Sequence, residues 1–435
     1  MARGKKKEQL SLEEKLEQAL VPAGEQPYQV PGNWCWIHLL NAFDNVTDSK
    51  KKLTTKEYSA VGEYPIIDQG QEFIGGYTDN EDVVHESNLP IVIFGDHTRC
   101  VKYIDFRFVQ GADGVKVLKP KSFWNAKAFC YAFQAIEIPN VGYRRHYPLF
   151  KNFCIPVPPL AEQQRIVDRI ERMFAQLDEA KEKVQYVRNC CDDNFASAVH
   201  EALTGNLTER WRLQKGISKS EWKKDKLGNL GILERGRSKH RPRNDSRLFG
   251  GAYPFIQTGD VAEANVFIKK HKQTLSEFGL EQSKMFAKGT LCITIAANIG
   301  DTAILSYDCC FPDSVVGFTP YKNVESKFVY YMMNELQKEI EANAPATAQK
   351  NINLRILKDI DMIIPPISEQ KKIIAILDEL FDKKMKIKTK TEETVDAINR
   401  IKKLILVKAF RGQLGTNHPE EESAMELLKS ILMES

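Results

Sequence analysis

The sequence lacks long apolar runs and has no strong excess of either charge. No hydrophobic stretch approaches the roughly 18 residues that a membrane-spanning helix needs. The basic N-terminus leads into a charged, helix-patterned segment at 10–20 rather than into an apolar signal core. The 435 residues include 62 Lys and Arg against 58 Asp and Glu, a net charge of +4. We therefore expect a cytoplasmic protein in which any nucleic-acid interface depends on where charges cluster.

Signatures of catalysis and of metal binding are also missing. The nine cysteines form no Cys-x-x-Cys pair, and the eight histidines are scattered without the spacing of metal ligands. There is no glycine-rich phosphate loop, no Asn-Pro-Pro-Tyr-like methyltransferase segment, and no GxSxG or HExxH motif. These absences predict free thiols in a reducing compartment and a chain with no metal site and no catalytic residues.

An internal repeat is the strongest feature present. The segment Pro-Pro-Leu-Ala-Glu-Gln-Gln-Arg-Ile-Val from Pro158 matches Pro-Pro-Ile-Ser-Glu-Gln-Lys-Lys-Ile-Ile from Pro365, an offset of 207 residues. The same offset carries Gly205 onto Gly412, so a block of about 50 residues recurs without a gap. A longer region of dissimilar sequence precedes each copy, at roughly 28–155 and 216–362. The chain therefore alternates variable region, repeat, variable region, repeat.

Each repeated block has the pattern of a long helix. The double proline suits a helix start, and the glycine a helix end. Apolar residues follow heptad spacing in both copies: Ile166, Ile170, Met173, Leu177, Ala180, Val184, Val187 and Cys191, then Ile373, Leu377, Leu380, Ile387, Ile398, Ile401 and Ile405. Lys384, Thr391 and Thr394 interrupt the second seam. Two matching faces favour an antiparallel intramolecular coiled coil over the alternative of two helices packed separately into two domains.

The variable regions are predicted to be mixed α/β domains. Ile91–Phe94 and Leu291–Ala296 have the composition of buried strands. Residues 126–134 and the segment from Phe328 to Ile340 have amphipathic helical spacing. Each region also carries a Tyr-Pro-apolar strand, beginning at Tyr64 and Tyr253.

Charge gathers most densely at Arg235–Arg247. This segment holds five Arg and one Lys against one Asp, and its Gly236 and Pro242 favour a loop. Arginines on a loop suit contacts with phosphates and with guanine edges, although a solvated basic loop is the alternative. The first variable region carries Lys50–Lys52 and Arg144–Arg145 near its two ends.

One short pattern is compatible with nuclease chemistry. Pro312-Asp313 followed by Glu325-Ser-Lys327 has the spacing of a Pro-Asp…Glu-x-Lys core, in which two carboxylates hold Mg²⁺. That core needs its Glu and Lys on a strand, whereas these residues stand where a helix is predicted to begin. A structural role is therefore the preferred interpretation, and a stand-alone Mg²⁺ nuclease is the alternative function.

The alternation of variable regions with Pro-Pro-x-x-Glu-Gln-x-x-Ile helices resembles the specificity subunit of type I restriction–modification systems. The resemblance covers nearly the whole chain. It is carried by Ile155–Gln164 and Ile363–Lys371, by the link Gly205–Trp211, and by the terminal segments 11–20 and 424–431. A specificity subunit of another restriction system is the alternative within the same class.

The resemblance implies an architecture and a set of partners. It implies an N-terminal helical segment at 1–27, target recognition domains at 28–155 and 216–362, conserved helices at 156–215 and 363–414, and a helical tail at 415–435. Each domain would recognise one half of a bipartite double-stranded DNA target, and the helices would set the spacer and hold modification subunits, two of them expected. The chain itself would bind no cofactor, because S-adenosylmethionine, ATP and Mg²⁺ belong to the modification and restriction subunits.

Within these domains we expect DNA contacts from polar and basic residues in loops. The candidates in the first domain are Gln69, His97, Arg99, Arg144, Arg145 and His146. The candidates in the second are Arg237, Lys239, Arg241, Arg243, Gln257, Asn298, Lys350 and Asn351.

Overall fold

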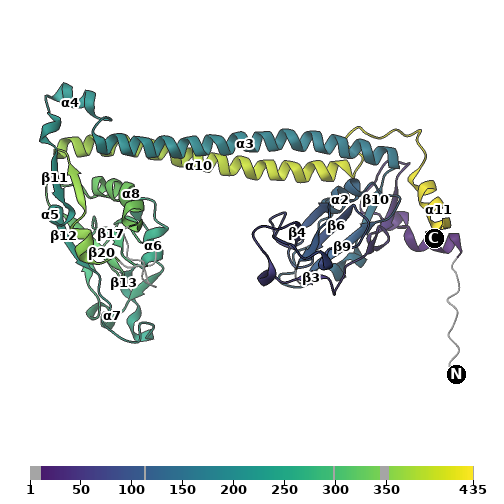
Figure 1. Cartoon of the computed structure of the whole chain (residues 1–435), viewed down its shortest axis with the longest axis horizontal. Helices are drawn as coiled ribbons and strands as arrows, with labels where there is room; N and C mark the ends of the chain where they lie inside the picture. The colour runs from purple at the N-terminus through teal and green to yellow at the C-terminus, as the bar shows by residue number, and fades with distance from the viewer. Residues whose placement is uncertain (1–10, 112–113, 297–298, 343–351, 435) are drawn as a thin grey trace. The chain divides into compact units, whose positions relative to one another are not determined.

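The computed structural model describes residues 11–111, 114–296, 299–342 and 352–434. The chain forms two compact units, the first made of Met1–Val184 with Glu393–Ser435 and the second of Gln185–Glu392. Two long helices, α3 (Leu160–Thr204) and α10 (Ile367–Ala409), each contribute one end to each unit (Figure 1).

The first unit contains two four-stranded sheets and a two-stranded ribbon. Their orders are β2-β9-β6-β7, β3-β8-β4-β5 and β1-β10. The strands are β1 (Cys35–His38), β2 (Phe43–Asn45), β3 (Lys52–Leu53), β4 (Tyr64–Ile67), β5 (Gly76–Thr78), β6 (Ile91–Gly95), β7 (Val101–Ile104), β8 (Val109–Gly111), β9 (Val115–Pro120) and β10 (Cys154–Val157). The helices besides the long pair are α1 (Leu12–Ala19), α2 (Ala126–Ala135) and α11 (Ala424–Glu434), with 3₁₀ turns η1 (Ala23–Glu25), η2 (Leu39–Asn41), η3 (Thr55–Glu57), η4 (Glu81–Val83) and η5 (Tyr147–Asn152).

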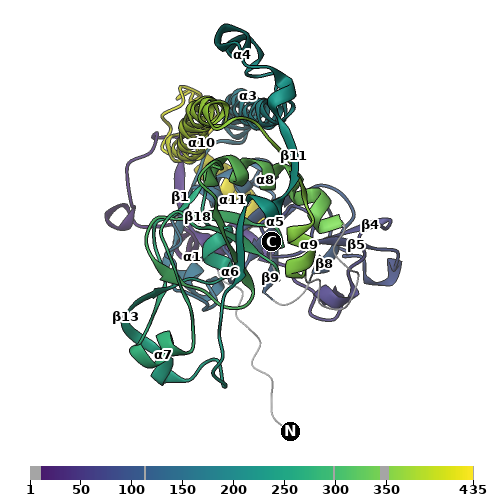
Figure 2. The same ribbon diagram turned by 90° about the vertical axis from the view of Figure 1, so that its left-hand side faces the viewer.

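The second unit repeats this plan, and Figure 2 turns it toward the viewer. Its sheet orders are β12-β20-β17-β18-β14, β15-β13-β19-β16 and β11-β21. The strands are β11 (Lys223–Lys226), β12 (Gly231–Arg235), β13 (Phe249–Phe255), β14 (Phe267–Ile268), β15 (Gln273–Leu275), β16 (Met285–Phe286), β17 (Leu291–Thr294), β18 (Thr302–Leu305), β19 (Cys309–Cys310), β20 (Val315–Pro320) and β21 (Asp361–Ile364). The helices are α4 (Glu209–Lys215), α5 (Leu227–Leu230), α6 (Thr258–Ala262), α7 (Glu277–Glu281), α8 (Ser326–Ala342) and α9 (Leu354–Lys358), with 3₁₀ turns η6 (Lys219–Glu221) and η7 (Ser246–Leu248).

The two units share most of their topology despite their dissimilar sequences; the second adds β14 beside β18, and its edge strand β16 runs antiparallel to β19 where β3 runs parallel to β8. The antiparallel order β2-β9-β6-β7 corresponds to β12-β20-β17-β18, and in each unit a helix, α2 or α8, follows the second of these strands. The mixed α/β class and the two-copy architecture predicted from the sequence are therefore confirmed. The predicted strands at Ile91 and Leu291 are β6 and β17, and the predicted helices are α2 and α8.

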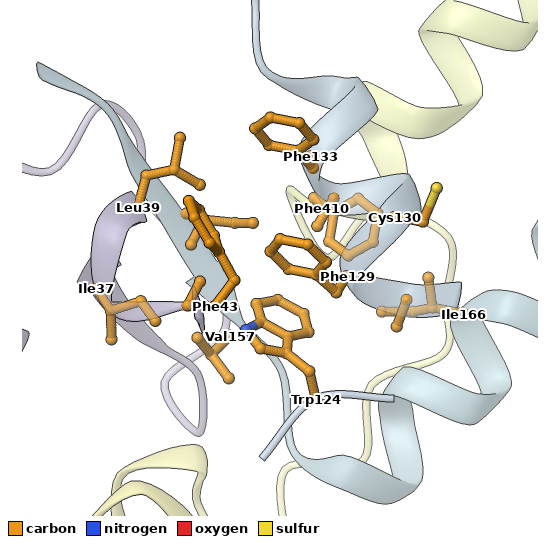
Figure 3. Packing of buried hydrophobic residues seen from close by; sticks show 14 of the residues in the cluster. Ile37, Leu39, Phe43, Trp124, Phe129, Cys130, Phe133, Val157, Ile166 and Phe410 are labelled. Carbon is orange, nitrogen blue, oxygen red and sulfur yellow. The ribbon is translucent and has the colours of Figure 1, made fainter. Parts of the chain in front are cut away.

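Aromatic packing builds the core of the first unit. Phe129 and Phe133 on α2 stack with ring centroids 5.8 Å apart, and Phe150 packs edge-on against both Phe133 and Phe43. Ile166 from the start of α3 joins the same cluster with no solvent exposure (Figure 3). Burying such side chains contributes about 1.5–3 kcal/mol each, so the long helix is anchored by its first turns.

Both long helices begin where the sequence predicts, α3 also ends there, and α10 ends slightly earlier than predicted. Each starts directly after a double proline, and α3 ends one residue before Gly205, which has a φ of +83°. Gly412, with a φ of +70°, lies three residues beyond the end of α10. A positive φ of this size suits glycine because a Cβ would clash there.

The contacts between the long helices have an antiparallel order, because residues later in α3 contact residues earlier in α10. In the first unit the Lys402 ammonium lies 2.5 Å from the Asp178 carboxylate. In the second unit the rings of Phe195 and Phe381 lie 5.7 Å apart, and Lys384 pairs with Asp192 at 2.9 Å. Lys384, predicted to weaken the seam, thus contributes an ion pair to it.

The heptad prediction is wrong at several positions. Ala180 is exposed, and the exposed fractions of Val187 and Ile401 are 49% and 44%. The fully buried positions, such as Ile166 and Ile373, belong to the helix ends that pack into the domain cores. Val187, midway along α3, lies outside both domain cores and is partly exposed.

Candidate nucleic-acid interface

The basic loop of the second unit follows β12 and is anchored by its backbone. The Arg237 amide donates to the Phe311 carbonyl at 3.1 Å, and the Lys239 amide donates to the Gln282 carbonyl at 3.1 Å. The Ser283 hydroxyl in turn donates to the Arg237 carbonyl. Backbone bonding leaves the side chains of Arg237 and Lys239 exposed.

Asp245 binds two side chains at the C-terminal end of this loop. The Arg247 guanidinium and the His240 ring each approach its carboxylate to 2.8 Å. Hydrogen bonds from Arg247 and then from His240 hold the pKa of Asp245 well below its usual range. Both partners also contact the Phe278 ring of α7, so the loop is tied to that helix.

Three candidate residues of the second unit line one pocket of about 170 Å³: Arg237, Arg243 and Gln257. Arg243 donates to both carboxylate oxygens of Asp313 at 3.0 Å, which holds its guanidinium at the pocket rim. Gln257 donates to the side-chain oxygen of Gln273 at 2.7 Å. Phe249 and Phe255 supply apolar wall. The arrangement joins amide and guanidinium donors to an apolar surface, the chemistry that contacts base edges.

The remaining candidates of the second unit are placed less favourably or are not described. Arg241 is exposed, but its guanidinium donates to the carbonyls of Ser238 and His240 in its own loop. Asn298, Lys350 and Asn351 lie outside the residues that the structure describes.

The candidates of the first unit converge around the turn after β6. The Gln69 side-chain oxygen accepts from the His97 amide at 3.2 Å, although the two residues are 28 positions apart. Arg99 donates to the Ile138 carbonyl at 3.0 Å, which brings the segment after α2 alongside. Arg144 and Arg145 of that segment are exposed.

His146 requires a correction. Its side chain has no solvent exposure, and its Nδ1 lies 2.8 Å from the Asp96 carbonyl. The His146 amide donates to the same carbonyl, and the Tyr147 amide donates to the Asp96 carboxylate at 2.7 Å. A buried ring cannot contact DNA, so His146 instead fastens the Arg144–Arg145 segment to the β6 turn.

Tyr143, which is 92% exposed, is not among the residues predicted from the sequence. Its ring stacks on His97 with centroids 5.1 Å apart and an interplanar angle of 20°. The sequence signal at this position is an aromatic residue between a glycine and an arginine pair.

The residues of the nuclease hypothesis enter separate ion pairs. Asp313 pairs with Arg243, Lys327 pairs with Asp378 at 2.6 Å, and Glu325 lies 3.7 Å from Lys371. Within the described ranges, no group of three or more His, Cys, Asp or Glu side chains is arranged to hold a metal ion. Asp313 orients an arginine rather than joining a second carboxylate.

The repeated Glu-Gln pair builds a buried polar cluster at the start of each long helix. In the first unit, Glu162 has no exposed surface and accepts from the Trp34 indole at 2.7 Å and from the Thr416 hydroxyl at 3.2 Å. Gln163 donates to the carbonyls of Phe123 and Pro158, both at 2.9 Å. Burial raises the pKa of Glu162, and the Trp34 and Thr416 hydrogen bonds oppose this.

The second unit has the same cluster with one added charge. Glu369 accepts from the Trp222 indole at 2.8 Å and from the Thr208 hydroxyl at 2.6 Å. Arg212 adds a buried salt bridge at 2.6 Å, with 6% of its side chain exposed. The recurring Glu-Gln pair of the repeat therefore has a structural role, because each cluster ties a domain to the start of one long helix and to the segment that follows the other.

Comparison with known proteins identifies the fold. A family model described as "Type I restriction modification DNA specificity domain" matches residues 43–185 and 219–397. The chain belongs to this family. Specificity subunits are the non-catalytic component of type I systems, which argues against the nuclease alternative.

Individual relatives have low sequence identity to this chain, but the matches extend over most of it. The EcoBI specificity subunit of Escherichia coli is 24% identical over 313 residues, covering 64% of this chain and 64% of the relative. The EcoR124I/EcoR124II specificity subunit of Escherichia coli is 22% identical over 375 residues, covering 79% of this chain and 86% of that one. The chain thus spans less than two thirds of the EcoBI subunit's length.

One solved structure shares the fold. That structure is described as the structural basis of complex assembly and conformational transition of the type I R-M system. Its TM-score is 0.64 at 19% identity, and the match covers 89% of this chain and all of the other. Separately, no helix of the described ranges is long and apolar enough to cross a membrane.

Proposed function

We propose that this chain is the DNA sequence-specificity subunit of a type I restriction–modification complex. Each domain, 28–155 and 216–362, recognises one half of a bipartite double-stranded DNA target. The observation that carries the proposal is duplication: two domains with matching core sheets each present exposed arginines on anchored loops. Each domain is tied to the start of one long helix and to the segment that follows the end of the other.

The long helices act as an antiparallel coiled coil that sets the spacer between half-sites. Support comes from the antiparallel order of the contacts: Asp178 of α3 pairs with Lys402 of α10, and the later Asp192 pairs with the earlier Lys384. The conserved helical parts are 156–215 and 363–414, with terminal segments at 1–27 and 415–435. Exposed apolar residues on α3 and α10, such as Val187 and Leu404, suit the docking of modification subunits, two of them by the duplication.

DNA contacts come from the exposed and half-buried members of the two surfaces. These are Gln69, His97, Arg99, Arg144 and Arg145 in the first, and Arg237, Lys239, Arg241, Arg243 and Gln257 in the second. Asn298, Lys350 and Asn351 remain candidates from the sequence alone. The chain binds no cofactor; S-adenosylmethionine, ATP and Mg²⁺ are held by modification and restriction subunits, and the complex works in the cytoplasm.

A domain swap tests this function. Residues 216–362 are replaced by the corresponding domain of another family member, and the host's DNA methylation is mapped by sequencing. A split methylated motif is expected, and the swap should change one half of it only. Absence of a split motif in the wild-type strain, with the modification subunits expressed, or a change in both halves, would contradict the proposal.

A further inference from the structure

An exposed tyrosine stands among the arginines of the first domain. Tyr143 is 92% exposed, the largest fraction among the described large hydrophobic residues that are exposed. Its ring stacks on His97, yet the residue as a whole remains open to solvent. Gly142 before it has a φ of +72°, so the backbone turns sharply there.

Several contacts hold the turn that carries this tyrosine. The Tyr143 carbonyl lies 3.2 Å from Nδ1 of His97, whose own amide donates to Gln69. Beyond the tyrosine, His146 is locked to the Asp96 carbonyl through both its amide and its ring. Before it, Arg99 holds the Ile138 carbonyl. These contacts hold the backbone before and after the tyrosine, and the His97 ring supports one face of the tyrosine ring.

The charges around the ring favour an anionic partner. Arg144 and Arg145 follow it directly and are exposed, and Arg99 lies on the facing turn. The nearby carboxylates are engaged: Asp96 accepts from the Tyr147 amide, and Glu137 pairs with Lys403 at 2.8 Å. In such an arrangement the cationic side chains attract phosphates, and the aromatic ring offers a surface against which a base edge can pack.

We propose that Tyr143 is a specificity-determining residue that contacts a base edge in the half-site recognised by domain 28–155. The arginines beside it bind phosphates and set the register, while the tyrosine ring packs on a base and its hydroxyl donates to an acceptor there. His97 is the positioning residue that supports the ring. This inference rests on the proposed function of the chain.

The test uses the chain assembled with its modification subunits. Tyr143→Ala is compared with wild type, with Tyr143→Phe, and with Tyr321→Ala, which removes a half-exposed tyrosine of the other domain. Binding is measured on duplexes with the mapped motif, with each half-site altered in turn, and on unrelated DNA. Methylation motifs are mapped in parallel.

Tyr143→Ala should weaken binding to the mapped site by about 5- to 150-fold, the range expected when a single interaction with a base is removed. Binding to unrelated DNA and the salt slope should stay unchanged, because every phosphate interaction is retained. Only the half-site of domain 28–155 should become degenerate, Tyr143→Phe should retain part of the discrimination, and Tyr321→Ala should behave as wild type.

Three results would overturn the inference. They are equal weakening on all DNA with a shallower salt slope, loss of co-purification with the modification subunits, and unaltered discrimination by Tyr143→Ala. The failure of the proposed function is distinct, because wild type itself would then show no bipartite motif.

Discussion

At the residue scale, the two buried glutamates at the helix starts differ in one partner. Glu162 accepts from an indole and a hydroxyl, whereas Glu369 also pairs with the buried Arg212. Removing one member of a buried ion pair leaves the other charge without compensation and costs about 3–5 kcal/mol. Glu162 has no buried cation among its hydrogen-bond partners, so removing its charge leaves no buried charge unpaired.

We therefore expect Glu369→Gln to destabilise the chain far more than Glu162→Gln. The decrease for Glu369→Gln should be about 3–5 kcal/mol in the free energy of unfolding, and the decrease for Glu162→Gln should be smaller. Urea denaturation followed by tryptophan fluorescence measures both, since Trp34 and Trp222 bond to these carboxylates. The exposed Glu379→Gln serves as the neutral control, and equal decreases at the two buried sites would refute the expectation.

The raised pKa of Glu162 predicts a pH dependence of defined sign. Between the unfolded value near 4.5 and the higher folded value, the folded state binds more protons than the unfolded state. The free energy of unfolding contributed by this group therefore rises as the pH falls through that window, and the gain is complete below the unfolded value. Wild type should gain stability relative to Glu162→Gln as the pH is lowered from 7 toward 4.5. A constant difference in urea midpoints across this range would show that burial does not raise this pKa.

At the element scale, the end of α3 is followed by a glycine that has little space for a side chain. A Cβ on Gly205 would meet Arg212 and Trp222 at 3.1 Å, in addition to the strain of its φ of +83°. Gly216 at the end of α4 has a similar φ of +66° but open space around it. Comparing substitutions at the two glycines separates two effects, because Gly216 has the backbone strain alone and Gly205 has the strain and the steric crowding.

Gly216→Ala should cost about 1–2 kcal/mol, the penalty of a left-handed conformation for an L-residue. Gly205→Ala should cost more, because it adds crowding against the buried Arg212 cluster. Thermal unfolding of both variants measures the difference. Equal costs would mean that the cluster relaxes freely around the added methyl group.

The basic loop of the second domain is an element whose role depends on charge. Arg241→Ala with Arg243→Ala should weaken DNA binding by the assembled complex and lower the log–log salt slope by about 0.9 for each phosphate interaction that the substitutions remove. Binding titrations at several salt concentrations provide the slope, and the exposed pair Arg172→Ala with Arg400→Ala on the long helices is the matched control. Weaker binding with an unchanged slope would assign these arginines to base contacts, and unchanged binding would exclude the loop from the interface.

At the scale of the whole molecule, the helix pair is the proposed ruler. Asp178 pairs with Lys402 within the first unit, and Arg188 lies 3.9 Å from Glu392 within the second. Continuing this antiparallel numbering gives the step from 185 to 186 and the step from 394 to 395 as matched insertion sites. Seven helical residues inserted at both steps add about 10.5 Å, close to three base pairs, while nearly preserving the facing sides.

The double insertion should lengthen the unrecognised spacer by about three base pairs and leave both half-sites unchanged. Mapping of methylated motifs measures the spacer directly. The same insertion in α3 alone is the control, and it should abolish methylation because the two helices would no longer match. A changed half-site sequence after the double insertion would contradict the modular arrangement.

Local sequence determined the elements of this protein. The double prolines and glycines set the ends of α3 and α10, the apolar spacing marked α2, α8, β6 and β17, and the repeat revealed the duplicated plan. Such signals suffice because helix and strand formation depend on neighbours a few residues apart. The heptad interpretation failed at Val187, because the spacing of apolar residues does not reveal how much a facing element covers them.

Only the tertiary structure decided which loop residues can meet a partner. Gln69 meets His97, and Arg243 meets Asp313 across 70 positions, contacts that no local pattern encodes. His146 and Tyr143 stand three residues apart with similar neighbours in sequence, yet one is fully buried and the other 92% exposed. The physical reason is that exposure depends on which distant backbone groups accept a side chain's hydrogen bonds, and that is settled only when the chain folds.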